Sequence, residues 1–164
     1  MVLMVLVRAI LLSVLLASSG LAGEFSGSVV GVLDGDTIEV VHAHQTERIR
    51  LSGIDCPEKG QAYGQRARQT TSARAFGKEV TLQTFGKDRY GRTIADVILP
   101  DGGNLNQILV KEGMCWWYRK YAPGNAVLEE LETDAREKRT GLWADAQPVP
   151  PWEWRKAKRT PSPK

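Results

Sequence analysis

With 164 residues, a formal net charge of +3 and a pI of about 8.9, the chain can form one domain around one core. Its basic character suggests an acidic partner, but the charge is uneven. Residues 24–147 carry 16 basic and 18 acidic side chains, whereas residues 148–164 carry 5 basic and 1 acidic. Overall charge therefore cannot give the folded part its affinity for an acidic partner. That affinity must come from locally placed arginines.

The first 22 residues have the pattern of a secretory signal. A single charge, Arg8, precedes an apolar run over residues 9–17, and small residues lead up to Ala22. This pattern predicts cleavage after Ala22 and secretion or export to the periplasm. The apolar residues 1–7 before Arg8 leave open an uncleaved segment that anchors the protein to a membrane.

The first half of the remaining chain predicts three strands and a helix. β-rich or alternating segments bounded by turn residues predict strands over residues 26–33, 37–41 and 48–51. Asp34-Gly35 is a tight hairpin dipeptide between the first two strands. Residues 63–76, rich in Ala, Arg and Gln, predict a helix that Gly77 ends.

The second half predicts two more strands and two more helices. The strands cover residues 80–85 and 93–99. Asn104 and Asn125 are expected to cap helices that end at Gly113 and Gly141. Five short strands with three helices indicate an α+β domain, most simply a small Greek-key barrel with helices packed on it.

The predicted organisation has three parts. A signal peptide covers residues 1–22, one folded domain covers residues 23–147, and a basic, proline-rich tail covers residues 148–164. The tail is expected to be flexible.

The two cysteines, Cys56 and Cys115, leave two alternatives open. An even number of cysteines in an exported chain permits one disulfide. The other alternative is a pair of buried thiols, since the sequence does not show whether the two side chains approach each other.

Five charged residues form a set suited to cleaving phosphodiesters. They are Asp36, Arg50, Asp55, Glu58 and Arg92. The two aspartates can offer hard oxygen ligands to a divalent cation, the glutamate can hold a water, and guanidinium groups match the geometry of a phosphate. Taken singly, each could also be an ordinary turn or surface charge.

The motifs that contain these residues resemble those of the thermonuclease family, of which staphylococcal nuclease is the best-known member. They are Asp-Gly-Asp-Thr at residues 34–37, the stretch 50–58, Asp-Arg-Tyr-Gly-Arg at residues 88–92 and Gly-Leu-Trp at residues 141–143. The resemblance covers roughly residues 26–143. It implies an OB-type barrel and a nuclease that cuts DNA and RNA with Ca²⁺.

The resemblance also implies a role for each matching residue. Asp36 and Asp55 correspond to the metal carboxylates, and Cys56 stands where a backbone carbonyl completes the protein ligands, a position that is commonly threonine. Glu58 corresponds to the general base or to a residue that orients the attacking water. Arg50 and Arg92 correspond to the two arginines that stabilise the transition state.

Tyr90 and Tyr121 are the two tyrosines expected to face the substrate. Tyr121 best matches a family tyrosine that packs a nucleotide base, while Arg119 stands where a second tyrosine is found. Of the neighbouring Trp116 and Trp117, one is expected in the core because adjacent strand residues face opposite sides.

The sequence thus predicts an exported, Ca²⁺-dependent nuclease for DNA and RNA that acts as a monomer without a stable protein partner. The alternative is a non-catalytic OB-fold module that binds single strands. Such a module would not need paired aspartates together with Glu58, and their combination favours the enzyme.

Overall fold

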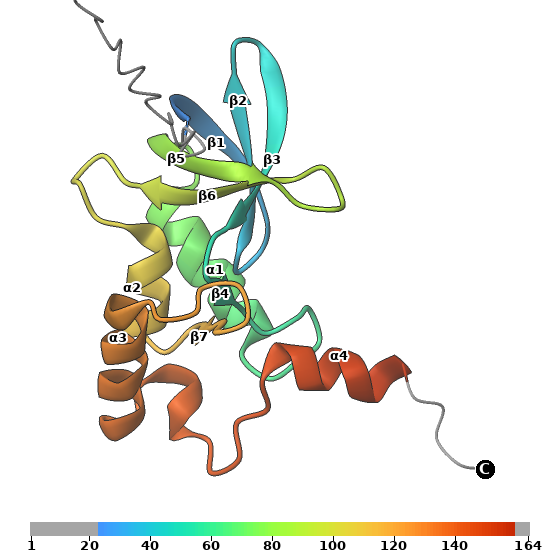
Figure 1. Cartoon of the computed structure of the whole chain (residues 1–164), viewed down its shortest axis with the longest axis vertical. Coiled ribbons are helices and arrows are strands. Elements are labelled where there is room, and N and C mark those ends of the chain that lie inside the picture. Colours follow the sequence, from blue (N-terminus) through green and yellow to red (C-terminus); the bar gives the residue numbers. More distant parts are fainter. Residues whose placement is uncertain (1–22, 160–164) are drawn as a thin grey trace, which may run out of the picture.

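The computed structural model of the protein describes residues 23–159. The expected signal segment lies outside this range, as do residues 160–164. Within the range, a closed five-stranded barrel is combined with four α-helices (Figure 1). The predicted α+β class with a small five-stranded barrel is therefore confirmed. No helix between residues 23 and 159 is long and apolar enough to cross a membrane.

The barrel strands follow the order β1-β2-β3-β6-β5, and β5 closes back on β1. They are β1 (Glu24–Asp34), β2 (Thr37–His42), β3 (Gln45–Leu51), β5 (Glu79–Lys87) and β6 (Thr93–Ile98). Neighbours run antiparallel except β3 and β6, which are parallel. Side chains alternate between the barrel interior and its surface, as the strand period requires. Ile38, Val40, Leu82 and Val97 are completely buried inside.

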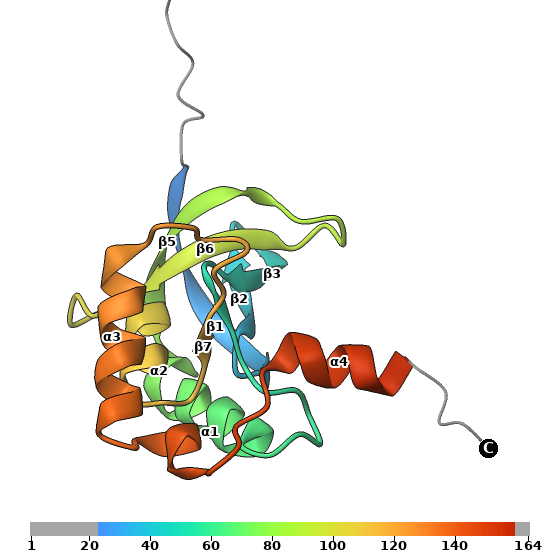
Figure 2. The ribbon, with the colours of Figure 1, turned by 60° about the horizontal axis from the view of Figure 1, so that its bottom comes forward.

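Three helices pack together at one end of the barrel (Figures 1 and 2). They are α1 (Gly64–Ala75), α2 (Leu105–Lys111) and α3 (Ala126–Glu137). Asn104 accepts a hydrogen bond from the Gln107 amide at 3.1 Å, and Asn125 accepts one from the Leu128 amide at 3.0 Å. These caps start α2 and α3 where the sequence predicts them.

A two-stranded sheet, β4 (Ile54–Asp55) with β7 (Trp116–Trp117), links the barrel to the helices. One of the two tryptophans was expected in the core, but both are buried, at 6% and 4% exposed. Both faces of this short sheet are covered. Trp117 belongs to the main core, whereas Trp116 packs on Trp143 of the short helix η1 (Gly141–Ala144), with ring centroids 4.3 Å apart.

The segment after Pro148 is helical where the sequence predicts a flexible tail. Pro151–Arg159 forms α4. A proline is compatible with a first helical turn because its missing N–H would have no partner there. Glu153 lies in the first turn and three bases, Lys156, Lys158 and Arg159, lie in the last, which suits the helix dipole. The prediction of a flexible tail rested on the basic charge and proline content of the segment, and it overlooked this helical pattern.

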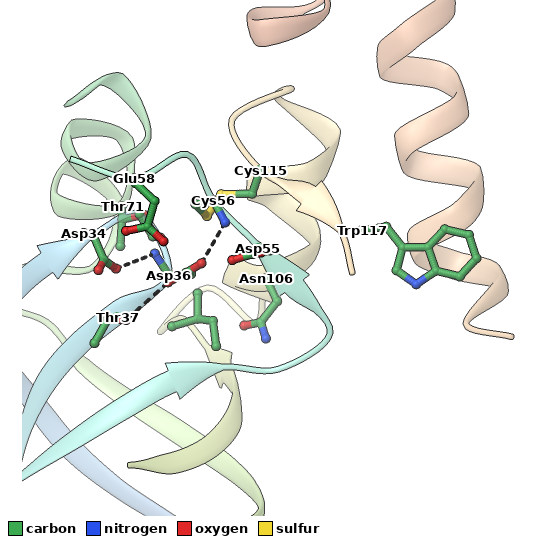
Figure 3. Close-up of a disulfide and its surroundings, with 12 residues drawn as sticks. Asp34, Asp36, Thr37, Asp55, Cys56, Glu58, Thr71, Asn106, Cys115 and Trp117 are labelled. Carbon is green, nitrogen blue, oxygen red and sulfur yellow. Dashed lines mark hydrogen bonds between the residues drawn. A yellow bond between two sulfur atoms is a disulfide. The ribbon is translucent and has the colours of Figure 1, made fainter. Parts of the chain in front are cut away.

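The cysteines form a disulfide, which resolves the two alternatives that the sequence left open. Cys56 directly follows β4 and Cys115 directly precedes β7. The antiparallel pairing of Asp55 with Trp116 brings these positions side by side. The bond therefore ties the loop after β4 to the segment between α2 and β7 (Figure 3).

Replacing both cysteines with serine should lower the free energy of unfolding by about 2–4 kcal/mol, because a cross-link over 59 residues restricts the unfolded chain. Urea denaturation without reductant measures this difference. Dithiothreitol should destabilise the wild-type protein by a similar amount and leave the double variant unchanged. Equal midpoints for the two proteins without reductant would contradict the expectation.

Candidate active site

Three of the predicted residues, Asp36, Arg50 and Asp55, meet at one end of the barrel, and Figure 3 shows the two aspartates. Asp36 lies in the turn between β1 and β2, Arg50 lies near the end of β3, and Asp55 ends β4. The register of β2 and β3 pairs Thr37 with Arg50, so Asp36 lies beside the guanidinium. Strand pairing thus brings together residues that are far apart along the chain.

The turn before Asp36 is packed so tightly that it requires a glycine. A Cβ on Gly35 would lie 2.8 Å from the Cβ atoms of both Ala67 and Cys56. Helix α1 and the disulfide-bonded loop therefore both approach the turn closely. The hydroxyl of Thr71 on α1 also donates a 2.6 Å hydrogen bond to the Gly35 carbonyl. These contacts hold the turn in one position.

Asp36 is 6% exposed and both of its carboxylate oxygens accept hydrogen bonds. The Cys56 amide donates to Oδ2 at 2.7 Å, and the Thr37 hydroxyl donates to Oδ1 at 3.2 Å (Figure 3). Cys56 thus contributes to the site through its backbone as well as through the disulfide. The structure joins the disulfide directly to the orientation of a predicted metal ligand.

One guanidinium nitrogen connects the two aspartates. Nη2 of Arg50 lies 3.2 Å from Asp36 Oδ2 and 3.2 Å from Asp55 Oδ1. Nη1 of Arg50 donates to the Leu51 carbonyl at 2.8 Å, which fixes the side chain. Because both carboxylates approach the same nitrogen, their oxygens converge on one region of positive charge.

Asp55 is only 2% exposed, so its charge is poorly hydrated. Burial raises the pKa of Asp55, and the hydrogen bond from Arg155 offsets this only in part. The neighbouring Asp36 raises the pKa of Asp55 further, while Arg50 opposes the rise. This carboxylate would gain from an additional positive charge.

Asp34 is the third carboxylate near the turn. Its Oδ1 accepts a 3.2 Å hydrogen bond from the Asp36 amide. Burial, together with the negative charge of Asp36, raises the pKa of Asp34 to about 7. Asp34 therefore shapes the turn, and its raised pKa limits the negative charge that it adds beside Asp36.

Glu58 lies at the edge of the same site, with its side chain 34% exposed. Gln61 holds its backbone on both sides, since the Gln61 side chain accepts from the Glu58 amide at 3.1 Å and the Gln61 amide donates to the Glu58 carbonyl at 2.8 Å. A Cβ on Gly64 would lie 2.0 Å from that carbonyl. The loop thus fixes the backbone of Glu58 and leaves its carboxylate partly open to water.

Arg155 of α4 is a site residue that the sequence analysis missed. Its Nη2 lies 2.6 Å from Asp55 Oδ2, and its Nη1 lies 3.2 Å from Asp55 Oδ1 and 2.6 Å from Glu58 Oε1. Burial opposes the charge of Arg155, but the hydrogen bonds that it donates to Asp55 and Glu58 raise its pKa, so it stays cationic. The signal available was the helical pattern from Pro151 onward, which would have placed Arg155 on an ordered element.

Arg92 is not in contact with the carboxylates in the described structure. Its Nε donates to Asp88 Oδ2 at 2.7 Å within the turn between β5 and β6. Burial would raise the pKa of Asp88, but hydrogen bonds from Arg92 and from backbone amides outweigh it and hold that pKa below its ordinary value. The turn fixes Arg92 by this ion pair, and the guanidinium carbon also lies 5.5 Å from the centre of the Tyr90 ring.

The two predicted substrate tyrosines are both on the surface. Tyr90 is 68% exposed and Tyr121 is 69% exposed. The ring of Tyr121 meets that of Tyr118 edge-on at 4.8 Å, and Tyr118 stacks on Trp152 of α4 at 5.1 Å. An aromatic surface therefore lies beside α4. Arg119 instead pairs with the buried Glu132 at 2.9 Å.

The donor chemistry of the site fits a hard divalent cation. Within residues 23–159 no group of three or more His, Cys, Asp or Glu side chains is arranged to hold a metal ion. Asp36 and Asp55 nevertheless offer converging carboxylate oxygens, and both are neutralised here by guanidinium groups. Two carboxylates would leave most of a Ca²⁺ coordination shell for backbone, water and substrate oxygens.

Comparisons with known proteins show which family the sequence resembles. Residues 48–145 match the family model described as staphylococcal nuclease homologue. An uncharacterized endonuclease of Escherichia coli O157:H7 is 47% identical over 138 residues, covering 84% of this chain and 90% of that protein. A micrococcal nuclease of Shigella flexneri is 46% identical over 155 residues, covering 89% of each chain.

The fold and the site define an OB-type barrel protein with a carboxylate and arginine centre. The chain belongs to the staphylococcal nuclease family.

Replacing Asp34 with asparagine should flatten the pH dependence of stability in the metal-free protein. Because the folded-state pKa of Asp34, about 7, lies above its ordinary value of 3.8, the folded state holds this proton more tightly than the unfolded state. Stability from this group is full below about pH 4 and is lost as the pH rises toward 7. Thermal melts in chelator between pH 4 and 8 should show a smaller decline for the variant. Asp55 would retain part of the decline, and an unchanged slope would contradict the assignment.

Proposed function

We propose that the protein is an exported, Ca²⁺-dependent nuclease that hydrolyses phosphodiester bonds of DNA and RNA with little sequence preference. Membership of the family supports nuclease activity in the general sense. The observation that carries the finer proposal is the convergence of Asp36 and Asp55 on one Arg50 nitrogen, with Glu58 at the edge of the same site. Such a set suits charge stabilisation at a phosphate.

The proposed cation would be held by Asp36, Asp55 and the backbone carbonyl of Cys56. When bound there, Ca²⁺ would supply positive charge to the phosphate oxygens. The disulfide and the Cys56 amide, which bonds Asp36 at 2.7 Å, keep the loop that carries two of these ligands in register with the hairpin turn. The protein's own contribution is a rigid frame for the ligands.

Glu58 is proposed to orient the attacking water or to accept its proton. The water oxygen forms the new bond to phosphorus, and its proton passes to the Glu58 carboxylate. The bond to the leaving oxygen breaks, and that oxygen keeps the electron pair and takes a proton from solvent water. Glu58 suits this role because its backbone is fixed by Gln61 while its carboxylate is partly exposed. A carboxylate that is fixed in position and partly exposed can hold a water molecule in a defined orientation.

Arg50 and Arg92 are proposed to stabilise the phosphorane-like transition state. Negative charge builds on the equatorial oxygens as water attacks, and fixed guanidinium donors are most effective where charge develops. Arg50 lies at the metal carboxylates, and Arg92 is held by Asp88 on the neighbouring turn. The two would approach a phosphate from different elements of the barrel.

The proposed substrate is nucleic acid, which Tyr90 and Tyr121 would contact through their exposed rings. The protein would act as a monomer without a stable protein partner. The alternative, a module that only binds single strands, has no use for two aspartates that are only 6% and 2% exposed beside Glu58. Burying two carboxylates in one place is costly unless positive charge offsets it, and a divalent cation would add to the charge that Arg50 supplies there.

Cleavage of DNA and RNA should require Ca²⁺ at roughly millimolar concentration, as expected for a site with few protein carboxylates. The assay follows release of acid-soluble nucleotides with Ca²⁺, with EGTA, and with EGTA plus Mg²⁺. Asp55→Ala is the negative control, because it removes a proposed ligand. Full activity in EGTA with Mg²⁺ would reject Ca²⁺ as the cofactor.

Arg50→Ala, Arg92→Ala and Glu58→Gln should each lower kcat by at least about a hundredfold, because each removes a group that acts mainly in the transition state. Arg48→Ala, which removes an exposed arginine from the same strand as Arg50, should remain near wild type.

Calcium affinity should fall far less in these variants than in Asp36→Ala or Asp55→Ala. Kinetics and calorimetric Ca²⁺ titration on folded proteins measure both effects. A Glu58→Gln enzyme within a fewfold of wild type would reject the proposed role of Glu58, even if the protein cleaves nucleic acid.

A further inference from the structure

Helix α4 places a cationic group on the residues that the proposed reaction needs free. Arg155 contacts both oxygens of Asp55, at 2.6 and 3.2 Å, and Oε1 of Glu58 at 2.6 Å. The two carboxylates belong to β4 and to the loop after it, nearly a hundred residues before α4. In both ribbon views α4 lies beside this loop (Figures 1 and 2).

These contacts are incompatible with the proposed roles of the same atoms. A divalent cation coordinated by Asp55 would need carboxylate oxygens that the guanidinium of Arg155 now engages, and the two positive groups would repel each other at such short range. Glu58, bonded to a guanidinium at 2.6 Å, has its carboxylate directed toward Arg155. It is therefore less available to a water.

Other contacts hold α4 in this position. Trp152 stacks on Tyr118 with an interplanar angle of 1° and meets Trp116 edge-on at 5.6 Å. The Gln61 side chain donates a 2.7 Å hydrogen bond to the Val149 carbonyl, just before the helix. Pro151 is buried. A built interface therefore docks the helix, and Arg155 is its point of contact with the proposed catalytic residues.

The docked helix also lies on part of the aromatic surface beside the site. Tyr118, which Trp152 covers, is in edge contact with Tyr121. Arg50, which is proposed to act on the phosphate, pairs with the two proposed metal ligands. Arg155 differs because it also engages the proposed base, pairing with Glu58 as well as with Asp55.

We propose that α4 is an autoinhibitory element, an inference that rests on the proposed function. Its Arg155 pairs with Asp55 and Glu58 until Ca²⁺ and nucleic acid displace the helix. The exposed bases at the end of the helix, Lys158 and Arg159, give phosphates a means of drawing it away. The active state is then one in which α4 has left the carboxylates.

The first test is Ca²⁺ binding to the full chain by titration calorimetry. Arg155→Ala should bind Ca²⁺ about five- to a hundredfold more tightly than wild type, the usual range for coupling between mutually exclusive states. Arg155→Lys should lie between the two, since an ammonium cannot hold both carboxylates as a fork does. Arg48→Ala removes an exposed arginine that pairs with Glu39 and has no part in the proposed site, and it should match wild type.

The second test is hydrogen exchange of the wild-type protein with and without Ca²⁺. Calcium should speed exchange in α4 while slowing it around residues 36 and 55–58. A ligand that merely stabilised the fold would slow exchange in both places. Slower exchange in α4 would therefore overturn the proposal.

The third test is cleavage of single-stranded DNA at limiting Ca²⁺. Arg155→Ala should be several-fold faster than wild type, with a smaller difference at saturating Ca²⁺. Trp152→Ala, which weakens docking without removing the guanidinium, should change the rate in the same direction. A loss of activity in Arg155→Ala would show that this arginine serves the reaction and would overturn autoinhibition.

The outcomes separate this inference from the function on which it rests. Equal Ca²⁺ affinity in wild type and Arg155→Ala overturns autoinhibition alone. If neither protein binds Ca²⁺, the proposed metal fails and the inference fails with it. Tighter binding in the variant without cleavage of DNA or RNA by either protein supports competition at Asp55 and rejects the nuclease.

Discussion

The structure depends on how it compensates the negative charge of two buried carboxylates. Asp36 and Asp55 are 6% and 2% exposed, so water hydrates them poorly, and each must be offset by fixed donors or cations. The Cys56 amide and Arg50 supply part of this compensation. Arg155, from a separate helix, supplies the rest for Asp55, and the proposed function depends on another cation being able to replace it there.

The surrounding architecture keeps these charges in place. The disulfide fixes the loop after β4, Gly35 allows α1 and that loop to close on the hairpin turn, and strand register sets Arg50 beside Asp36. Asn106 is 2% exposed and links the barrel to α2, accepting from the Val97 amide at 3.1 Å and donating to the Ser52 carbonyl at 3.0 Å. Such supporting contacts allow a site to hold charge without rearranging.

Glu132 is a second buried carboxylate whose charge is offset by fixed donors and cations, but none of its partners among residues 23–159 comes from a separate docked helix. Glu132 is 1% exposed and accepts hydrogen bonds from the Trp117 amide, Arg119 and Arg136. Arg136 belongs to the same helix, α3, and Arg119 lies in the segment just after β7, so this compensation is part of the fold. Asp55 differs because one of its cationic partners, Arg155, comes from a separate C-terminal helix held by aromatic contacts. A partner of this kind can be exchanged for another cation, and the proposed autoinhibition by α4 depends on that exchange.

The sequence by itself determined the elements and the types of residue at the site. Apolar alternation, Asn caps and turn glycines predicted the five barrel strands and α1 to α3, and the motifs around Asp36, Arg50 and Asp55 indicated the carboxylate and arginine centre. These are local signals, carried within a few residues of each other. Tertiary structure alone decided the disulfide, the burial of both Trp116 and Trp117, and the docking of α4. Arg155 contacts residues 97 and 100 positions away, so its role depends on where two distant segments pack, which no local pattern encodes.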